Sequence, residues 1–182
     1  MAKGGSFERE ICDRLSLWWC GDPDRRVFWR SSGSGATASV RAKKGKRTAD
    51  HHGDVCCIDP CGAALTDLLT IECKRGHNRV SLQDLLDCRP GQKGGNGKGE
   101  NLPDWIARAQ TDHEAAGSYS WLLIVRRDGR LPLAIMPEYL ATGLAAALLD
   151  VGLRFDRLCA VPLDKFLTLV LPADVRRLAK EV

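Results

Sequence analysis

No apolar run in the sequence is long enough to cross a membrane. The longest such runs, at 121–125 and 144–149, fall far short of the roughly 20 residues that a membrane helix needs. The first five residues, MAKGG, lead directly into a charged helical pattern, which is unlike a secretory signal peptide. We therefore expect a cytoplasmic protein with no membrane partner.

The sequence also lacks any Cys-x2-Cys pair, although it contains eight cysteines. Cys56, Cys57 and Cys61 cluster close to His51 and His52, but their spacing fits neither a zinc site nor a disulfide framework. Cys56 and Cys57 fall in an expected strand, where a free thiol behaves as a small apolar group. We expect reduced thiols in a reducing compartment, with a structural zinc site as the alternative.

Acidic residues are absent from the segment 25–47, which carries eight basic residues. These are Arg25, Arg26, Arg30, Arg41, Lys43, Lys44, Lys46 and Arg47. Such a block is typical of a solvated loop, and it also attracts the phosphates of nucleic acids. The net charge of the whole chain is only +4, so the basic charge is concentrated in one region rather than spread along the chain.

Length and composition are ordinary for a soluble globular protein. The 182 residues, 44% of them hydrophobic and 27% charged, are enough for a sizeable core, and the sequence shows no internal repeat. We expect a single domain over 1–182, with mobile loops at about 31–52 and about 89–101 and a helical extension at about 137–182.

Hydrophobic spacing predicts an alternation of helices and strands. Phe7, Ile11, Leu15 and Trp18 recur at helical intervals and define the buried face of a first helix. Further helices are expected at 81–87, 103–116, 137–149 and 163–169, and strands at 26–30, 54–58, 65–73, 121–125, 131–136 and 158–161. Residues 59–62 are expected to turn a hairpin between the second and third of these strands. The order predicts an α/β fold with a mixed central β-sheet flanked by helices.

The tripeptide Glu72-Cys73-Lys74 ends an apolar run that predicts a buried strand. Glu72 and Lys74 stand two residues apart, so their side chains point to the same face of that strand. Asp54 opens another apolar run upstream. Two carboxylates and a lysine at strand ends suit a Mg²⁺-dependent phosphodiesterase, because the carboxylates hold a hard cation. The lysine can help to form the nucleophile and can neutralise charge in the transition state.

Other interpretations of these residues compete with the functional one. Asp50 lies in the expected loop, and Asp59 lies in the expected turn, where aspartate is common for conformational reasons. Asp54 begins a strand and is therefore preferred. For Glu72 and Lys74, the alternative is a salt bridge at a sheet edge without a role in catalysis.

The order of a helix glutamate, an aspartate and a Glu-x-Lys resembles the signature of the PD-(D/E)XK nuclease superfamily. Within it, about the first 75 residues are similar to the archaeal-type Holliday junction resolvases, including forms carried by phages. Those proteins begin with Lys-Gly, three variable residues and Glu-Arg-Glu, and later carry Arg-Ser-x-Gly-Ser. The matching residues here are Lys3, Gly4, Glu8, Arg9, Glu10, Arg30, Ser31, Gly33, Ser34, Asp54, Glu72 and Lys74.

The resemblance implies a restriction-endonuclease-like core and a metal-dependent endonuclease that hydrolyses phosphodiester bonds in DNA. The implied metal is Mg²⁺ or Mn²⁺, with no small-molecule cofactor. The implied ligands are Glu8, Asp54, Glu72 and the backbone carbonyl of Cys73, and Lys74 is implied to be catalytic. The family pattern favours Glu8 over its neighbour Glu10.

The resemblance also implies DNA as the partner and a bacterial or phage-infected cell as the setting. The expected DNA-binding residues are Arg9, Arg30, Ser34, Arg41, Lys43, Lys44, Lys46 and Arg47. A homodimer is expected, because a four-way junction is two-fold symmetric and is cut at paired positions. Gln110 is a further candidate for orienting the attacking water or the phosphate, and His52 is a candidate acid or base.

The sequence leaves the DNA substrate open, because the segments after the Glu-x-Lys strand look like additions to the compact archaeal enzymes. Resolution of a Holliday junction is the first expectation. Nicking or degradation of duplex DNA by a phage nuclease in genome processing is the second. The third is a non-catalytic DNA-binding protein on the same scaffold.

Overall fold

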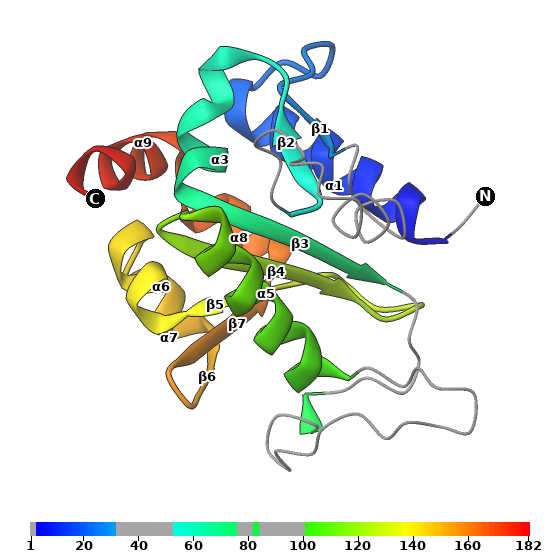
Figure 1. Ribbon diagram of the computed structural model, residues 1–182, viewed down its shortest axis with the longest axis vertical. Helices are drawn as coiled ribbons and strands as arrows, with labels where there is room; N and C mark the ends of the chain where they lie inside the picture. Colours follow the sequence, from blue (N-terminus) through cyan, green and yellow to red (C-terminus); the bar gives the residue numbers. More distant parts are fainter. Residues whose placement is uncertain (1–2, 32–52, 76–81, 84–100) are drawn as a thin grey trace.

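The computed structural model describes residues 3–31, 53–75, 82–83 and 101–182, and a five-stranded sheet lies at its centre (Figure 1). The strands are β3 (Leu69–Arg75), β4 (Ser120–Arg126), β5 (Leu133–Pro137), β6 (Leu153–Phe155) and β7 (Leu158–Pro162). They lie in the order β3-β4-β5-β7-β6. β3 and β4 are parallel, and the other neighbours in this sheet are antiparallel. The predicted α/β fold with a mixed central sheet is confirmed.

Helix α5 (Leu102–Ala116) makes the crossover that the parallel pair β3–β4 requires. Asn101 and Asp104 form a capping box at its start, in which each side chain accepts from the backbone N–H of the other residue. Trp105 and Ala109 of α5 are buried in one apolar cluster with Leu123 of β4. Figure 1 shows the helix lying across one face of the sheet.

Helix α1 (Lys3–Cys20) belongs to the larger apolar cluster, which contains the opposite face of the sheet. The cluster joins residues of the helix to residues of β3 and β4: Phe7, Ile11, Leu15, Ile71, Cys73, Leu122 and Ile124. Phe7, Ile11 and Leu15 are buried as their helical spacing predicts. Trp18 is only half-buried, and its indole Nε1 donates to the carbonyl of Val170 at 3.0 Å.

Strands β1 (Phe28–Arg30) and β2 (Val55–Cys57) form a separate two-stranded antiparallel ribbon beside α1. Arg30 and Val55 are register partners at one end of this ribbon. Ser31, which follows β1, and Asp54, which precedes β2, are therefore brought together, although the 22 residues 32–53 separate them in the chain. This pairing positions Asp54.

The expected hairpin between 54–58 and 65–73 is wrong, because residues 60–68 are helical. They form a short 3-10 turn, Pro60–Gly62, followed by helix α3 (Ala63–Leu68). Asp59 caps the turn by accepting from the N–H of Cys61 at 3.0 Å. Leu65 and Leu68 are buried three residues apart, which is helical spacing that a short apolar run does not distinguish from a strand. β2 pairs with β1 and not with β3.

Residues 137–182 are not only helical. They contain helices α6 (Glu138–Leu144), α7 (Ala147–Val151), α8 (Leu163–Leu169) and α9 (Pro172–Glu181) together with strands β6 and β7. β7 lies between β5 and β6 in the sheet, so this segment completes the core and is not a helical appendage to it. The single helix expected at 137–149 is interrupted, because Ala145 has extended backbone angles.

Two further expectations concern thiols and membranes. The seven cysteines in the described part of the chain are all free, and three of them, Cys12, Cys73 and Cys159, are buried. No helix among the described residues combines the length and apolarity needed to span a bilayer. The expected loops at 31–52 and 89–101 and the helix at 81–87 lie almost entirely outside the described residues.

Candidate active site

Asp54 is fastened to the edge strand β3 through both its backbone and its side chain. Its N–H donates to the carbonyl of Ile71 at 2.8 Å, and its Oδ2 accepts from the N–H of Cys73 at 2.9 Å. β3 is the terminal strand of the five-stranded sheet, so these bonds satisfy backbone groups that a sheet edge leaves unpaired. Asp54 is 7% exposed, and its two hydrogen bonds fix its position relative to Glu72 and Lys74 of β3.

Gly53 and Ser31 hold this aspartate in place. Gly53 has φ +83°, and a Cβ there would lie 2.7 Å from the Ile71 carbonyl oxygen, so the tight approach to β3 requires glycine. The Ser31 Oγ donates to the Gly53 carbonyl at 2.6 Å, and the Ser31 N–H donates to the Asp54 carbonyl at 3.0 Å. Ser31, assigned by sequence to a flexible loop, is 4% exposed and supports the site.

Glu72 and Lys74 lie on the same face of β3, as their spacing predicts, and they meet Asp54 there. The Lys74 Nζ is 2.5 Å from the Glu72 Oε2 and 3.4 Å from the Asp54 Oδ2. Glu72 is 6% exposed, and the Lys74 side chain is 21% exposed. One ammonium group is therefore shared by two carboxylates in a largely buried position.

Burial and charge shift the protonation equilibria of this group in opposite senses. Burial first and the negative charge of Asp54 second raise the pKa of Glu72 to about 7, against the opposing effect of Lys74. Burial by itself lowers the pKa of Lys74, but the charges of Asp54 and Glu72 outweigh it, so the pKa is raised overall. Lys74 stays protonated, and the second carboxylate charge is costly until a further cation arrives.

Cys73 points away from this group into the larger apolar cluster. Burial raises the pKa of its thiol well above the ordinary value, so the sulfur is protonated and does not resemble a metal ligand. The role predicted for Cys73 belongs to its backbone carbonyl and stays a prediction.

Glu8, the predicted helix ligand, is engaged by an arginine. The Arg30 Nε and Nη2 each lie 2.8 Å from the Glu8 Oε2, and the Glu8 side chain is 13% exposed. Within the described ranges, no three His, Cys, Asp or Glu side chains are grouped closely enough to hold a metal ion. The structure thus brings Asp54, Glu72 and Lys74 together and pairs Glu8 with Arg30. The metal-binding role of Glu8 stays a prediction.

Two arginines that the sequence did not single out lie at the same end of the sheet. Arg75 and Arg126 are register partners on β3 and β4, one step beyond Lys74. Arg126 makes a two-pronged ion pair with Glu10, at 2.6 and 2.7 Å, and its guanidinium lies 4.6 Å from the Phe7 ring centroid. The sequence signal that could have identified these two arginines is their position at the ends of two apolar runs, because the ends of parallel neighbouring strands lie at the same end of the sheet.

The remaining predicted residues are either away from this group or outside the described residues. Gln110 is exposed on α5 and donates to Glu114 at 3.5 Å. On the same helix, Asp112 contributes a small part of the rise in the Glu72 pKa, after burial and Asp54.

Asp59 has a structural role as the cap described above and as the partner of Arg25 at 2.6 Å. Arg9 is half-buried on α1, and its DNA-binding role stays a prediction. The predicted residues that lie outside the described ranges are Ser34, Arg41, Lys43, Lys44, Lys46, Arg47, Asp50 and His52.

Residues 1–151 match the protein family described as phage putative PDDEXK endonuclease. The chain belongs to this family. The match runs from α1 through the ribbon and β3 to the end of α7, which is about twice the length covered by the resemblance seen in the sequence. The assignment to the PD-(D/E)XK nuclease superfamily is confirmed, and the mixed sheet flanked by helices is consistent with a restriction-endonuclease-like fold. No curated protein and no solved structure matched this PD-(D/E)XK chain.

Proposed function

We propose that this PD-(D/E)XK chain is a metal-dependent DNA endonuclease whose preferred substrate is a four-way DNA junction. The buried group of Asp54, Glu72 and Lys74 on the edge strand carries the proposal. Its two carboxylates outnumber its one ammonium, so a divalent cation would relieve an excess of negative charge. A binding module on the same scaffold has no use for such an arrangement.

The donor atoms suit Mg²⁺ or Mn²⁺. Mg²⁺ takes one or two carboxylates from a protein and keeps several of its waters, so a cluster of three side chains is not required. Asp54 and Glu72 supply two carboxylates. Cys73 follows Glu72 in β3 and donates its N–H to Asp54, and its backbone carbonyl is a further proposed ligand. Glu8 of α1, which is paired with Arg30 of β1, is the additional ligand that we propose.

In the proposed hydrolysis of a phosphodiester, Lys74 and Asp54 have different roles. A bound divalent ion supplies positive charge that polarises the scissile phosphate and lowers the pKa of water. Lys74, whose raised pKa keeps it protonated, acts as a donor that orients the incoming water or stabilises charge building on the phosphate oxygens. Asp54 keeps its orientation through the Cys73 N–H, so little reorganisation is needed when substrate binds.

The proposed substrate rests on the residues that surround the site. Arg30 and Ser31, from the part of the chain that resembles the resolvases, contact Glu8 and the Gly53–Asp54 segment respectively. A two-fold symmetric junction favours a homodimer, in which each protomer cuts one strand. Duplex cleavage is the second candidate, because the family to which the chain belongs is described as an endonuclease without reference to a junction.

A cleavage panel separates these substrates. Four-way junction, flap, linear duplex and single-stranded DNA of shared sequence are incubated with the protein and Mg²⁺ or Mn²⁺. We expect paired, symmetric nicks in the junction and no cut in the matching duplex, with sedimentation showing a dimer. Equal cutting of the duplex would establish the second candidate instead, and no cutting of any DNA would overturn the nuclease proposal.

Substitutions assign the activity to the buried group. Asp54→Asn and Lys74→Met should each abolish cleavage while circular dichroism shows a folded protein. Glu181→Gln is the control: Glu181 is exposed at the end of α9, where it pairs with Arg177, and the substitution should leave cleavage unchanged. Near-normal metal-dependent cleavage by either site variant would contradict the assigned mechanism.

A further inference from the structure

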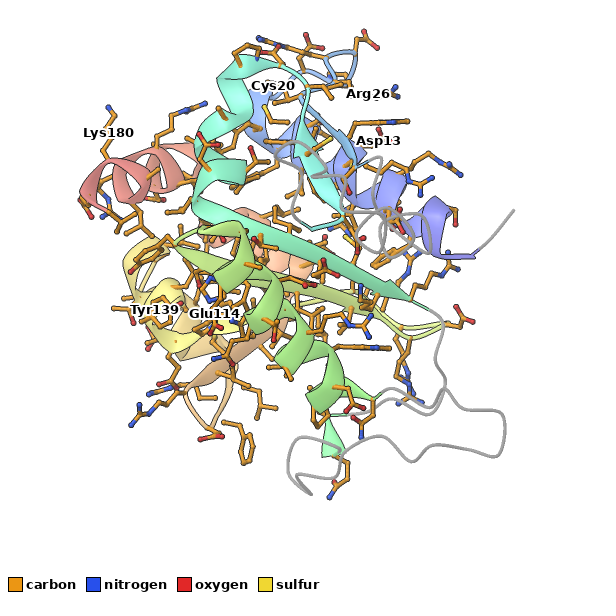
Figure 2. The ribbon with its side chains drawn as sticks, viewed as in Figure 1. Asp13, Cys20, Arg26, Glu114, Tyr139 and Lys180 are labelled. Atoms are coloured by element: carbon orange, nitrogen blue, oxygen red, sulfur yellow. The ribbon has the colours of Figure 1, made fainter. Side chains whose placement is uncertain are left out.

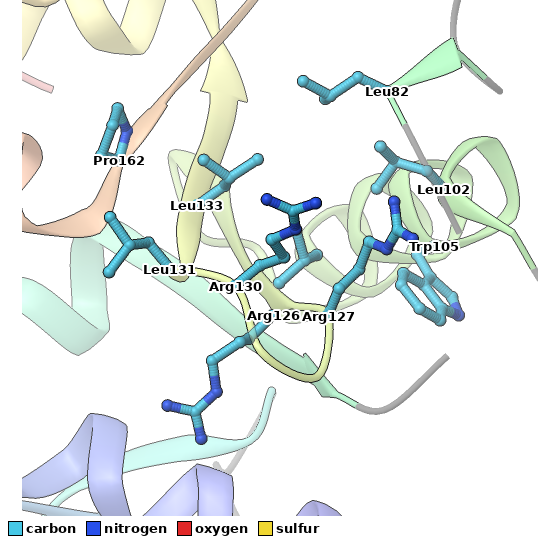
Figure 3. Close-up of a pocket in the computed structure, with 10 residues that line it drawn as sticks. Leu82, Leu102, Trp105, Arg126, Arg127, Arg130, Leu131, Leu133 and Pro162 are labelled. Atoms are coloured by element: carbon cyan, nitrogen blue, oxygen red, sulfur yellow. The ribbon is translucent and has the colours of Figure 1, made fainter. Parts of the chain in front are cut away.

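A pocket of about 480 Å³ lies on the sheet face that α5 covers (Figure 3). Val125 of β4 and Leu133 of β5 line it from the sheet, and Leu102 and Trp105 line it from the first turn of α5. Its volume falls in the range of about 300–1,000 Å³ that is usual for small-ligand sites. Leu131, also in the lining, is 68% exposed, so the pocket reaches the molecular surface.

The pocket continues the row of residues that contains Lys74. Lys74 pairs in register with Val125, Val125 with Leu133, and Leu133 with Pro162, and the last three all line the pocket. Register partners on neighbouring strands share a face of the sheet, and neighbouring strands lie about 4.8 Å apart. The sheet residues of the pocket therefore start one strand from the proposed catalytic lysine.

Arginines from the turn between β4 and β5 give the pocket a basic rim. Arg127 and Arg130 are exposed, and Figure 3 shows both projecting toward the pocket. Arg126 points away toward α1, where it pairs with Glu10. None of the described residues that line the pocket is acidic. The pocket thus combines an apolar interior with positive charge at its mouth.

We infer that this pocket receives one unpaired nucleotide of the DNA substrate, with the base against the apolar interior and a phosphate at Arg127 and Arg130. A base has two apolar faces that stack on aromatic and aliphatic surfaces with little dependence on sequence, and guanidinium groups match phosphate geometry. This inference rests on the proposed nuclease function, because Lys74 locates the cut.

The position of the pocket specifies which nucleotide would enter. Val125 and Leu133 lie one and two strands from Lys74, which is about 5 to 10 Å. That span corresponds to about one to three base steps of 3.4 Å. A paired and stacked base cannot enter, so the inferred substrate class is DNA with an interrupted stack within a few nucleotides of the cut, as at a branch point.

Two exposed leucines that each precede a proline supply a matched test. Leu131→Glu places a carboxylate at the pocket, and Leu171→Glu makes the same change at the start of α9, where Leu171 is 57% exposed. The probe is a duplex with one unpaired fluorescent adenine analogue, compared with its fully paired counterpart, without divalent metal. We expect wild type and Leu171→Glu to bind the unpaired probe about tenfold more tightly, with altered fluorescence.

Leu131→Glu should lose this preference, and the ratio of the two affinities is insensitive to a general loss of charge attraction. Equal affinities in the wild-type protein, or the same ratio in both leucine variants, would overturn the inference. The cleavage panel judges the nuclease separately. Metal-dependent cutting without a preference for unpaired DNA refutes only the pocket, whereas a preference without cutting of any DNA refutes only the nuclease.

Discussion

Two charged groups lie near the same end of the sheet and differ in how their charges balance. Asp54 and Glu72 share Lys74, so two carboxylates face one cation in a largely buried position. Glu10 and Arg126 form a one-to-one pair with two parallel hydrogen bonds, and the Glu10 side chain is 38% exposed. The first group has one negative charge more than its positive charge balances, whereas the charges of the second group cancel.

The difference separates a binding site from a structural contact. A balanced, partly solvated ion pair stabilises the protein slightly, and its charges are neutralised without a further ligand. An unbalanced buried group is costly in isolation, because its second negative charge is neither hydrated nor neutralised. Burial and the charge of Asp54 raise the pKa of Glu72 to about 7, in the direction that this cost predicts. Such a group is retained when a ligand completes it, and under the proposed function that ligand is a divalent ion together with a phosphodiester.

The largest expected contrast comes from the same substitution in the two groups. Glu72→Gln should lower cleavage by about 10³-fold or more, because it removes a proposed metal ligand. Glu10→Gln should leave cleavage within about twofold, because Glu10 contacts Arg126 and not the buried group. Cleavage rates at saturating Mg²⁺ measure both effects. Equal losses in the two variants would remove the distinction between the groups.

The next contrast is in stability against pH without metal. The pKa of Glu72 is raised from 4.5 to about 7 on folding, so its favourable contribution is complete below 4.5 and is lost as pH rises through about 7. At about pH 8, Glu72→Gln should therefore raise the free energy of unfolding by about 1–2 kcal/mol. Denaturant titration of the metal-free proteins measures this change, and a destabilised variant at that pH would contradict it.

Metal binding should also distinguish Glu72 from Glu10. Metal binding requires the ionised carboxylate, so Mg²⁺ affinity should rise with pH up to about 7, with protons released on binding below that value. Calorimetry in buffers of different ionisation enthalpy measures the proton release. Glu72→Gln should abolish the release, and Glu10→Gln should retain it. Release of equal size in both variants would place the titrating group elsewhere.

A smaller effect is expected on the stability of the balanced pair. Glu10→Gln should lower the free energy of unfolding by about 1 kcal/mol, because it weakens a two-pronged contact to a mostly buried arginine. At about pH 8, Glu10→Gln should lower the free energy of unfolding, whereas Glu72→Gln should raise it. The same denaturant titrations measure both changes. A change of the same sign in both variants would contradict the distinction between the balanced pair and the unbalanced group.

The smallest effect is expected at a third pair, which joins α1 to the segment before β1. Asp13 and Arg26, both labelled in Figure 2, are more than half exposed and lie 3.6 Å apart. Asp13→Asn should change the free energy of unfolding by less than about 0.5 kcal/mol, because water screens the pair. A change as large as that of Glu10→Gln would show that exposure is not what separates these contacts.

The sequence was a good guide to elements whose apolar pattern is long. The buried face of α1, helix α5 and strands β4 and β5 are all where hydrophobic spacing predicts them. It failed at α3, because six residues with two buried leucines fit a helix and a strand equally well. It also missed β6, whose three residues are too short to show a period, and α9, whose apolar positions are few.

At the candidate site, spacing predicted that Glu72 and Lys74 share a face. The place of Asp54 at the start of an apolar run favoured it as their partner over Asp50 and Asp59. The sequence did not reveal how Asp54 reaches them. That depends on the pairing of β1 with β2, on Ser31 and on the backbone contact of Gly53 with β3, all of which join distant parts of the chain. Sequence reasoning likewise could not show that Glu8 is held by Arg30.

The sequence by itself determined the chemical groups and their local directions, because a strand's period of two is a property of the backbone. It therefore predicted two carboxylates and a lysine suited to a phosphodiesterase. The tertiary structure decided their balance and surroundings. Only folding places one ammonium between two buried carboxylates, assigns Glu10 to Arg126, and sets an apolar pocket in register with Lys74. Charge compensation and burial depend on distances between segments far apart in the chain, and local spacing does not encode those distances.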